Sequence, residues 1–194
     1  MKLYFAAAAA VFLASAPAHA VSVMSAGQSV SQDCSIAAAK SGTPMSEREL
    51  NKGFAACDVA LKGDLSQFGR AGTLVNRGLL QVAAGNNDAA IADFNAGLDR
   101  DPSLAAGYMN RGMALLRAQR FTEARGDFDR AISLGTSDAH VAYFNRGEAQ
   151  EALGNPLAAY RDYRRAQELA PDFQPAKLEL TRFQVTDRRV ADNR

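Results

Sequence analysis

The residues best suited to chemistry in this sequence are arginines and aspartates that recur at a fixed spacing. A guanidinium can capture the carboxylate of a ligand, or it can pair with a carboxylate of its own chain. The constant spacing and the equal numbers of the two residue types favour structural ion pairs between neighbouring helices, which fix geometry more than they add stability. The predicted pairs, each sixteen residues apart, are Arg77 with Asp93, Arg111 with Asp127 and Arg146 with Asp162.

Cysteines and histidines are too few for the common catalytic and metal-binding sites. Cys34 and Cys57 form no Cys-x-x-Cys motif, and the only histidine beyond residue 20 is the distant His140. If the chain is exported to an oxidising compartment, an even cysteine count favours a structural Cys34–Cys57 disulfide, with a reactive pair or half a metal site as the alternative. The sequence has no serine-hydrolase, zinc-protease or phosphate-loop motif. We therefore predict no enzyme, no cofactor and no bound metal.

These residues belong to a longer pattern that repeats. The tripeptide Asn-Arg-Gly recurs after 34 and 35 residues, and an aromatic residue follows each aspartate: Phe94, Phe128 and Tyr163. An alanine lies four residues before each aromatic residue, and a small residue lies three residues after it. Apolar residues at helical spacing within each unit predict two helices joined by a short turn. Thr122 and Asn155 fit the N-caps of two of these helices.

This pattern resembles the tetratricopeptide repeat family, with repeats at residues 71–104, 105–138 and 140–173. Gly78, Gly112 and Gly147 stand where the family has a glycine that lets the two helices of a repeat pack closely. The resemblance implies an all-α solenoid of three helix pairs, in which stacked repeats bury a continuous core.

The segments outside the repeats predict helical units at both ends of this solenoid. Residues 34–70 carry both cysteines and a Ser46–Glu49 capping box, so we expect a helical segment there, which could be a half repeat. Residues 174–194 predict a capping helix and a tail, since a stack of helix pairs leaves an apolar face open at its end. The serine-rich residues 21–33 predict a flexible linker.

The first twenty residues are typical of a signal peptide. Lys2 precedes a short apolar run, which ends in the cleavage box Ala18-His19-Ala20. We therefore expect cleavage near Ala20 and a periplasmic or secreted product without a membrane anchor. The chain has 22 Lys+Arg against 21 Asp+Glu, a balance that indicates neither a nucleic-acid partner nor an anionic membrane surface.

The resemblance also implies that the first helices of the repeats line a concave groove, where an asparagine two residues before the glycine holds the backbone of a ligand. A carboxamide both donates and accepts hydrogen bonds, so Asn76, Asn110 and Asn145 are predicted to bind a peptide main chain. The alternative is that they only mark the repeat. Further candidate groove residues are Val75, Leu79, Met109, Met113 and Glu148.

The predicted function is a non-catalytic adaptor or scaffold that binds an extended peptide or a partner helix in this groove. Early apolar and late acidic groove residues favour a partner segment with apolar residues followed by Lys or Arg. The groove has few lysines and the repeated arginines are assigned to ion pairs, so a basic clamp for a C-terminal carboxylate is disfavoured. The alternative function is a structural subunit of an envelope assembly or a homo-oligomer, with the groove occupied by the protein itself.

Overall fold

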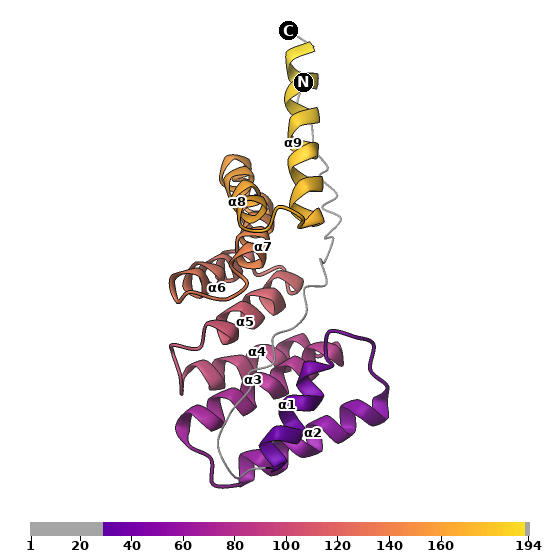
Figure 1. Ribbon diagram of the computed structural model, residues 1–194, viewed down its shortest axis with the longest axis vertical. Helices are drawn as coiled ribbons and strands as arrows, with labels where there is room; N and C mark the ends of the chain where they lie inside the picture. Colours follow the sequence, from indigo (N-terminus) through magenta and orange to yellow (C-terminus); the bar gives the residue numbers. More distant parts are fainter. Residues whose placement is uncertain (1–28, 193–194) are drawn as a thin grey trace.

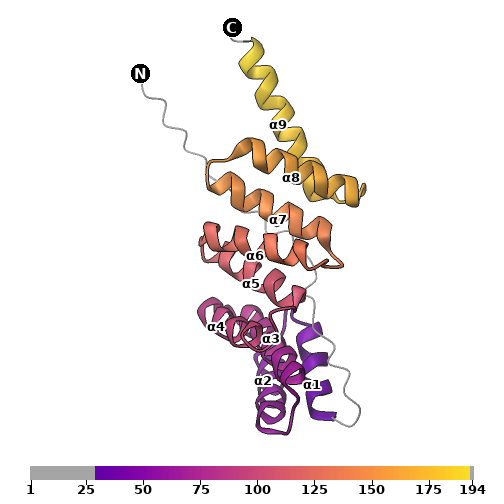
Figure 2. The ribbon, with the colours of Figure 1, turned by 90° about the vertical axis from the view of Figure 1, so that its left-hand side faces the viewer.

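The computed structural model describes residues 29–192, and in this part of the chain all regular secondary structure is helical, joined by short turns and loops. The helices stack side by side from α1 and α2 at one end to α9 at the other, and α9 projects beyond the stack (Figures 1 and 2). The prediction of an all-α solenoid is confirmed. The helices are α1 (Ser29–Ala39), α2 (Glu47–Lys62), α3 (Gln67–Ala83), α4 (Asn87–Leu98), α5 (Ala105–Arg117), α6 (Phe121–Ser133), α7 (Ala139–Ala152), α8 (Pro156–Leu169) and α9 (Gln174–Asp192).

The N-terminal unit is a full helix pair, which corrects two predictions. Residues 29–33 of the predicted linker lie in α1, and the predicted half repeat is the pair α1–α2. The helix forms because Ser31, Cys34 and Ala38 share one buried face, and α1 contacts both α2 and α3. A Cys34–Cys57 disulfide joins the pair. The rest of the linker and the predicted signal peptide lie outside the described residues.

Each of the three repeats is held together by an aromatic ring that lies against a glycine. A Cβ atom added to Gly78 would lie 2.5 Å from Cε1 of Phe94, and one added to Gly147 would lie 2.6 Å from Cε1 of Tyr163. Only a residue without a side chain lets the first helix approach the ring of the second this closely. The aromatic rings are buried, so the repeated glycines and aromatic residues form one packing unit.

The boundaries of several helices differ from the sequence prediction. Helix α3 begins at Gln67, before the predicted start of the first repeat at residue 71, because the Ser66 side chain caps it by accepting a hydrogen bond from the Gly69 N–H at 3.0 Å. Thr122 is not an N-cap, since α6 already begins at Phe121. Asn155 is at the N-cap of α8, but its side chain donates to Gln150 and caps nothing.

The stack curves with the first helix of each repeat on its inner side. Helix α3 contacts α5, and α5 contacts α7, whereas no comparable contact joins the described second helices α4, α6 and α8 to one another. Since the first helices lie closer together than the second, they form the concave side. We call the exposed side of α3, α5 and α7 the inner face.

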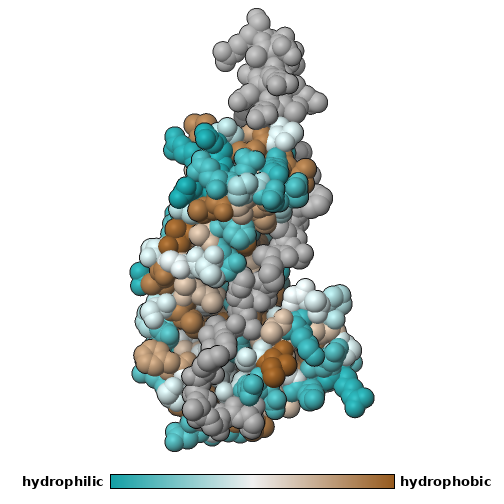
Figure 3. Space-filling view, in the orientation of Figure 1, coloured by the Kyte–Doolittle hydropathy of each residue, from teal (hydrophilic) through white to brown (hydrophobic). Residues whose placement is uncertain are grey.

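Helix α9 caps the last repeat. Ala176 and Leu180 are buried against α7 and α8, and the partly buried Phe183 ring lies 5.7 Å from the Tyr160 ring, centroid to centroid. Hydrophilic side chains cover the surface around α8 (Figure 3). Among the described residues, no helix combines the length and the apolar character that crossing a membrane requires.

Candidate functional site

The repeated arginines hold the second helix of their own repeat. Arg111, on α5, donates from Nε and Nη2 to the two carboxylate oxygens of Asp127, on α6, at 2.8 and 2.7 Å. The same two bonds are 2.9 and 2.6 Å long both for Arg77 with Asp93 and for Arg146 with Asp162. Each aspartate is buried, so the bidentate pairing compensates a carboxylate that would otherwise be costly to bury.

The same arginines also reach the repeat before their own, which the sequence analysis missed. Nη1 of each arginine donates to a side chain of the preceding second helix: Arg77 to Asp58 at 2.8 Å, Arg111 to Asn95 at 2.7 Å and Arg146 to Asp129 at 2.7 Å. Asn95 and Asp129 lie two residues after the aspartates of their own repeats, a spacing that could have indicated this role. The arginines therefore join neighbouring repeats and are engaged within the chain.

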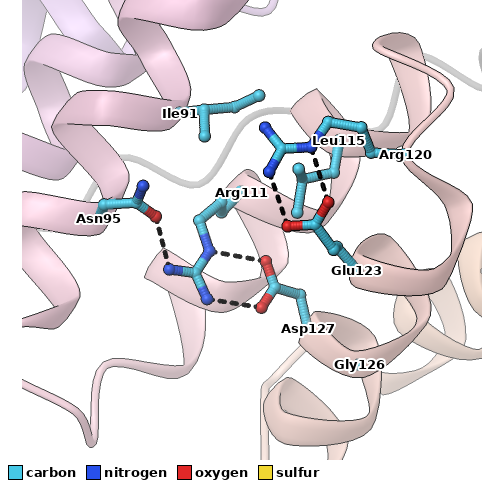
Figure 4. A pocket seen from close by; sticks show the side chains of 8 residues that line it. All are labelled: Ile91, Asn95, Arg111, Leu115, Arg120, Glu123, Gly126 and Asp127. Atoms are coloured by element: carbon cyan, nitrogen blue, oxygen red, sulfur yellow. Dashed lines mark hydrogen bonds and ion pairs between the residues drawn. The ribbon is translucent and has the colours of Figure 1, made fainter.

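A cavity of about 300 Å³ lies between α4, α5 and α6 at one of these junctions (Figure 4). Arg111 faces Asp127 there, and Arg120 forms two bonds with Glu123, at 2.8 and 2.6 Å. The two guanidinium groups are thus matched by two carboxylates. Because the cavity offers no uncompensated charge, we interpret it as part of the junction between repeats and not as a ligand site.

The asparagines predicted to bind a peptide are buried. Their exposed fractions are 1% for Asn76, 1% for Asn110 and 5% for Asn145. Asn76 and Asn110 each have an interaction partner within the chain. A peptide would have to replace these interactions in order to reach the amides, so their binding role stays a prediction.

The apolar candidates divide into core and partly accessible residues. Val75, Leu79 and Met109 are buried in the core of the stack, in contrast to the groove surface predicted for them. The close approach of α3 to its neighbours is the reason: a Cβ atom added to Gly97, on α4, would lie 3.1 Å from Cγ2 of Val75. Met113 is half-buried and remains partly accessible.

Two charged side chains stand out on the inner face. On each first helix, the residues three and seven positions after the repeated asparagine lie on the same side of the helix as the asparagine. Equivalent residues of α3, α5 and α7 therefore form two rows across the repeats. Glu148 and Arg117 are the charged residues of these two rows. Arg117 was not predicted from the sequence, although it lies two helical turns after Asn110. The rows consist of Leu79, Met113 and Glu148, and of Ala83, Arg117 and Ala152.

Glu148 lies in an acidic environment. Burial raises the pKa of Glu148 to about 8, and the nearby Glu179 and Glu151 carboxylates contribute to the shift. Arg182, on α9, donates to Glu179 at 2.7 Å and also to Glu151. The Tyr163 hydroxyl donates to Glu151 at 3.1 Å. Three carboxylates, those of Glu148, Glu151 and Glu179, therefore lie near the single Arg182 guanidinium where α7, α8 and α9 converge.

Comparison with known proteins identifies the repeats. Residues 75–140 and 140–173 match two profiles described as tetratricopeptide repeat, which together span slightly more than half of the 194 residues. The chain belongs to the tetratricopeptide repeat family. Among the described residues of this repeat protein, no group of three or more His, Cys, Asp or Glu side chains is arranged to hold a metal ion.

The repeats of this chain are similar to parts of longer proteins. RNA polymerase II-associated protein 3 from Xenopus laevis is 37% identical over 100 residues, which cover 52% of this chain and 15% of that protein. Serine/threonine-protein phosphatase 5 from Rattus norvegicus is 35% identical over 89 residues, which cover 46% of this chain and 18% of that protein. The chain thus matches less than a fifth of the length of these relatives.

Solved structures share the stack of repeats. The first repeat domain of Spaghetti (RPAP3), bound to the HSP90 peptide SRMEEVD, is 32% identical with a TM-score of 0.57, and the match covers 60% of this chain and 92% of that one. MamA, at 19% identity and a TM-score of 0.60 over 75% of this chain and 93% of its own, shows the fold alone.

Proposed function

We propose that this chain is a non-catalytic adaptor that binds an extended segment of a partner protein along its inner face. The observation that carries the proposal is the register of the first helices. Because α3, α5 and α7 contact one another in order, equivalent residues form continuous rows that a single extended segment can follow. The similar repeat domain of Spaghetti (RPAP3), which is bound to a peptide, supports the proposal.

The chemistry of the inner face favours a partner different from the acidic peptide SRMEEVD bound to that relative. In the row three residues after the asparagines, Leu79 is buried, and the partly accessible members change from the apolar Met113 to the acidic Glu148. The repeated arginines are engaged with carboxylates of their own chain and are not available to an acidic peptide. A segment with apolar residues followed by Lys or Arg therefore suits this face better.

Photo-crosslinking from two matched positions tests the proposal. A photoreactive amino acid replaces either Met113, on the inner face, or Leu157, which is 73% exposed on the second helix α8. The proposal expects a partner protein to be crosslinked from position 113 in its native cells and not from position 157. Crosslinking from position 157 alone, or equally from both positions, would show that the inner face is not the binding surface.

We also propose that the chain is exported and loses its first twenty residues. The leader pattern ending at Ala20 supports this, and so does a disulfide between Cys34 and Cys57, since such bonds persist in oxidising compartments. Fractionation of the producing cells and mass measurement of the purified protein test it. A product that begins at Val21 in an exported fraction is expected, whereas an intact chain in the cytosol would overturn it.

A further inference from the structure

Arg117 differs from the repeated arginines because none of the described side chains supplies a carboxylate for it. It is half-buried at the end of α5, and among residues 31–183, whose side chains the structure describes, no ion pair or hydrogen bond reaches its guanidinium group. Burial lowers the pKa of Arg117, in contrast to Arg77 and Arg146, whose pKa values are raised by their aspartates. A half-buried guanidinium without a counter-ion is costly, and a ligand carboxylate would remove this cost.

Glu148, on the neighbouring first helix α7, is a carboxylate in an acidic environment, whereas Arg117 is a cation without a carboxylate partner among the described side chains. The Glu148 carboxylate forms no ion pair within the described part of the chain, and the acidic groups around it outnumber the basic ones. Glu151 lies on the same helix, Glu179 and Arg182 lie on α9, and the Arg182 guanidinium already bridges these two glutamates. The Tyr163 hydroxyl, from α8, is bonded to Glu151. A cation supplied by a ligand would therefore be attracted to Glu148.

We propose that the inner face is bipolar: a bound peptide places a carboxylate against Arg117 and a Lys or Arg side chain against Glu148. This inference rests on the proposed function and adds the chemistry of the partner. It makes Arg117 and Glu148 the residues that determine specificity and set the position of the peptide along the stack.

The geometry also sets the spacing of the two charges in the partner. Adjacent packed helices lie about 8–10 Å apart. Arg117 occupies a row four residues beyond that of Glu148, which adds about 6 Å along the helix axis. An extended chain advances about 3.3 Å per residue. The acidic and basic residues of the partner are therefore expected about three or four positions apart.

The proposal has a consequence for pH dependence. The pKa of about 8 leaves Glu148 largely protonated near neutral pH in the unliganded protein. A bound cation stabilises the charged carboxylate and lowers its pKa, so binding releases a proton. The affinity for a Lys-containing peptide therefore rises with pH and levels off above about 8.

Fluorescence anisotropy with four labelled peptides tests the inference on the full chain. The peptides share one leucine- and alanine-rich host sequence, and two positions four residues apart carry Glu with Lys, Gln with Gln, Glu with Glu, or Lys with Lys. The Glu/Lys peptide is expected to bind about tenfold more tightly than the Gln/Gln peptide, and the Glu/Glu peptide more weakly than the Glu/Lys peptide.

Variants assign these preferences to the two residues. Arg117→Gln is expected to abolish the preference for Glu, whereas Glu148→Gln abolishes the preference for Lys and the rise of affinity with pH. Arg125→Gln, which removes a half-buried arginine from the second helix α6, is the matched control and leaves both preferences unchanged.

Two results would overturn the inference, and they can be told apart. If the Gln/Gln peptide binds as tightly as the Glu/Lys peptide, or if Arg117→Gln keeps the preference for Glu, the bipolar face is wrong while peptide binding stands. If none of the four peptides binds, the proposed function fails together with the inference.

Discussion

Substitution of Gly112 by alanine tests the packing unit that defines the repeats. A Cβ atom added there would lie 2.8 Å from Cε1 and 3.0 Å from Cζ of Phe128. The ring is fully buried, so its neighbours prevent it from moving away. Overpacking of this kind costs about 1–3 kcal/mol, whereas alanine is favoured over glycine inside a helix by about 1 kcal/mol. Gly112→Ala is therefore expected to lower the free energy of unfolding by up to about 2 kcal/mol.

Gly126, on α6, offers a matched control for this substitution. It is exposed within the helix, and nothing lies within 4 Å of an added Cβ atom. Gly126→Ala is expected to raise the free energy of unfolding by up to about 1 kcal/mol, since only the helix preference remains. The two variants should therefore differ by about 1–3 kcal/mol, which is the overpacking cost itself.

Urea unfolding followed by far-ultraviolet circular dichroism measures both variants against the parent protein. Phe128→Leu, combined with Gly112→Ala, should lose less stability than the sum of the single changes, because the smaller side chain makes room for the methyl group. If Gly112→Ala were as stable as Gly126→Ala, or if the two changes at residues 112 and 128 were additive, the packing argument would be refuted.

Three further predictions concern the turns, the disulfide and the acidic cluster. Gln119 adopts a φ of 58°, and the equivalent turn positions of the other two repeats are Gly85 and Gly154. Glycine adopts this left-handed conformation without strain, so Gln119→Gly is expected to raise the free energy of unfolding by about 0.5–1 kcal/mol. A lower thermal midpoint would contradict this. Reduction of the Cys34–Cys57 disulfide should lower the free energy of unfolding by about 3 kcal/mol and shift the urea midpoint to a lower concentration. A midpoint unaffected by reductant would exclude a stabilising role. The pKa of Glu148 is raised from 4.5 to about 8 in the folded protein, so between these pH values the folded state holds a proton that the unfolded state has lost. The free energy of unfolding therefore falls as pH rises through this window. Glu148→Gln should therefore gain stability over the parent between pH 4.5 and 8, and a pH-independent difference would show that the group is not buried as described.

The sequence alone determined the repeat unit, its period and the pairs within it. Gly78 and Phe94 recur at fixed spacing because both belong to one helix pair, whose helices are close in the chain. The same holds for Arg77 and Asp93, which are sixteen residues apart and face each other across antiparallel helices. Such contacts can be predicted because their geometry depends on one turn and two helices.

The contacts between repeats could not be predicted from the sequence, because they depend on how the helix pairs stack. The bonds from Arg77 to Asp58 and from Arg146 to Asp129 cross between repeats in this way. Helix α1 was predicted in part as a linker, because its burial comes from the disulfide and from contact with α3. The curvature of the stack also decides which side chains are covered: it buries the asparagines and leaves the Arg117 guanidinium without a carboxylate in the described part of the chain. Periodicity predicts a face of a helix, but burial and charge compensation on that face depend on the neighbouring repeats.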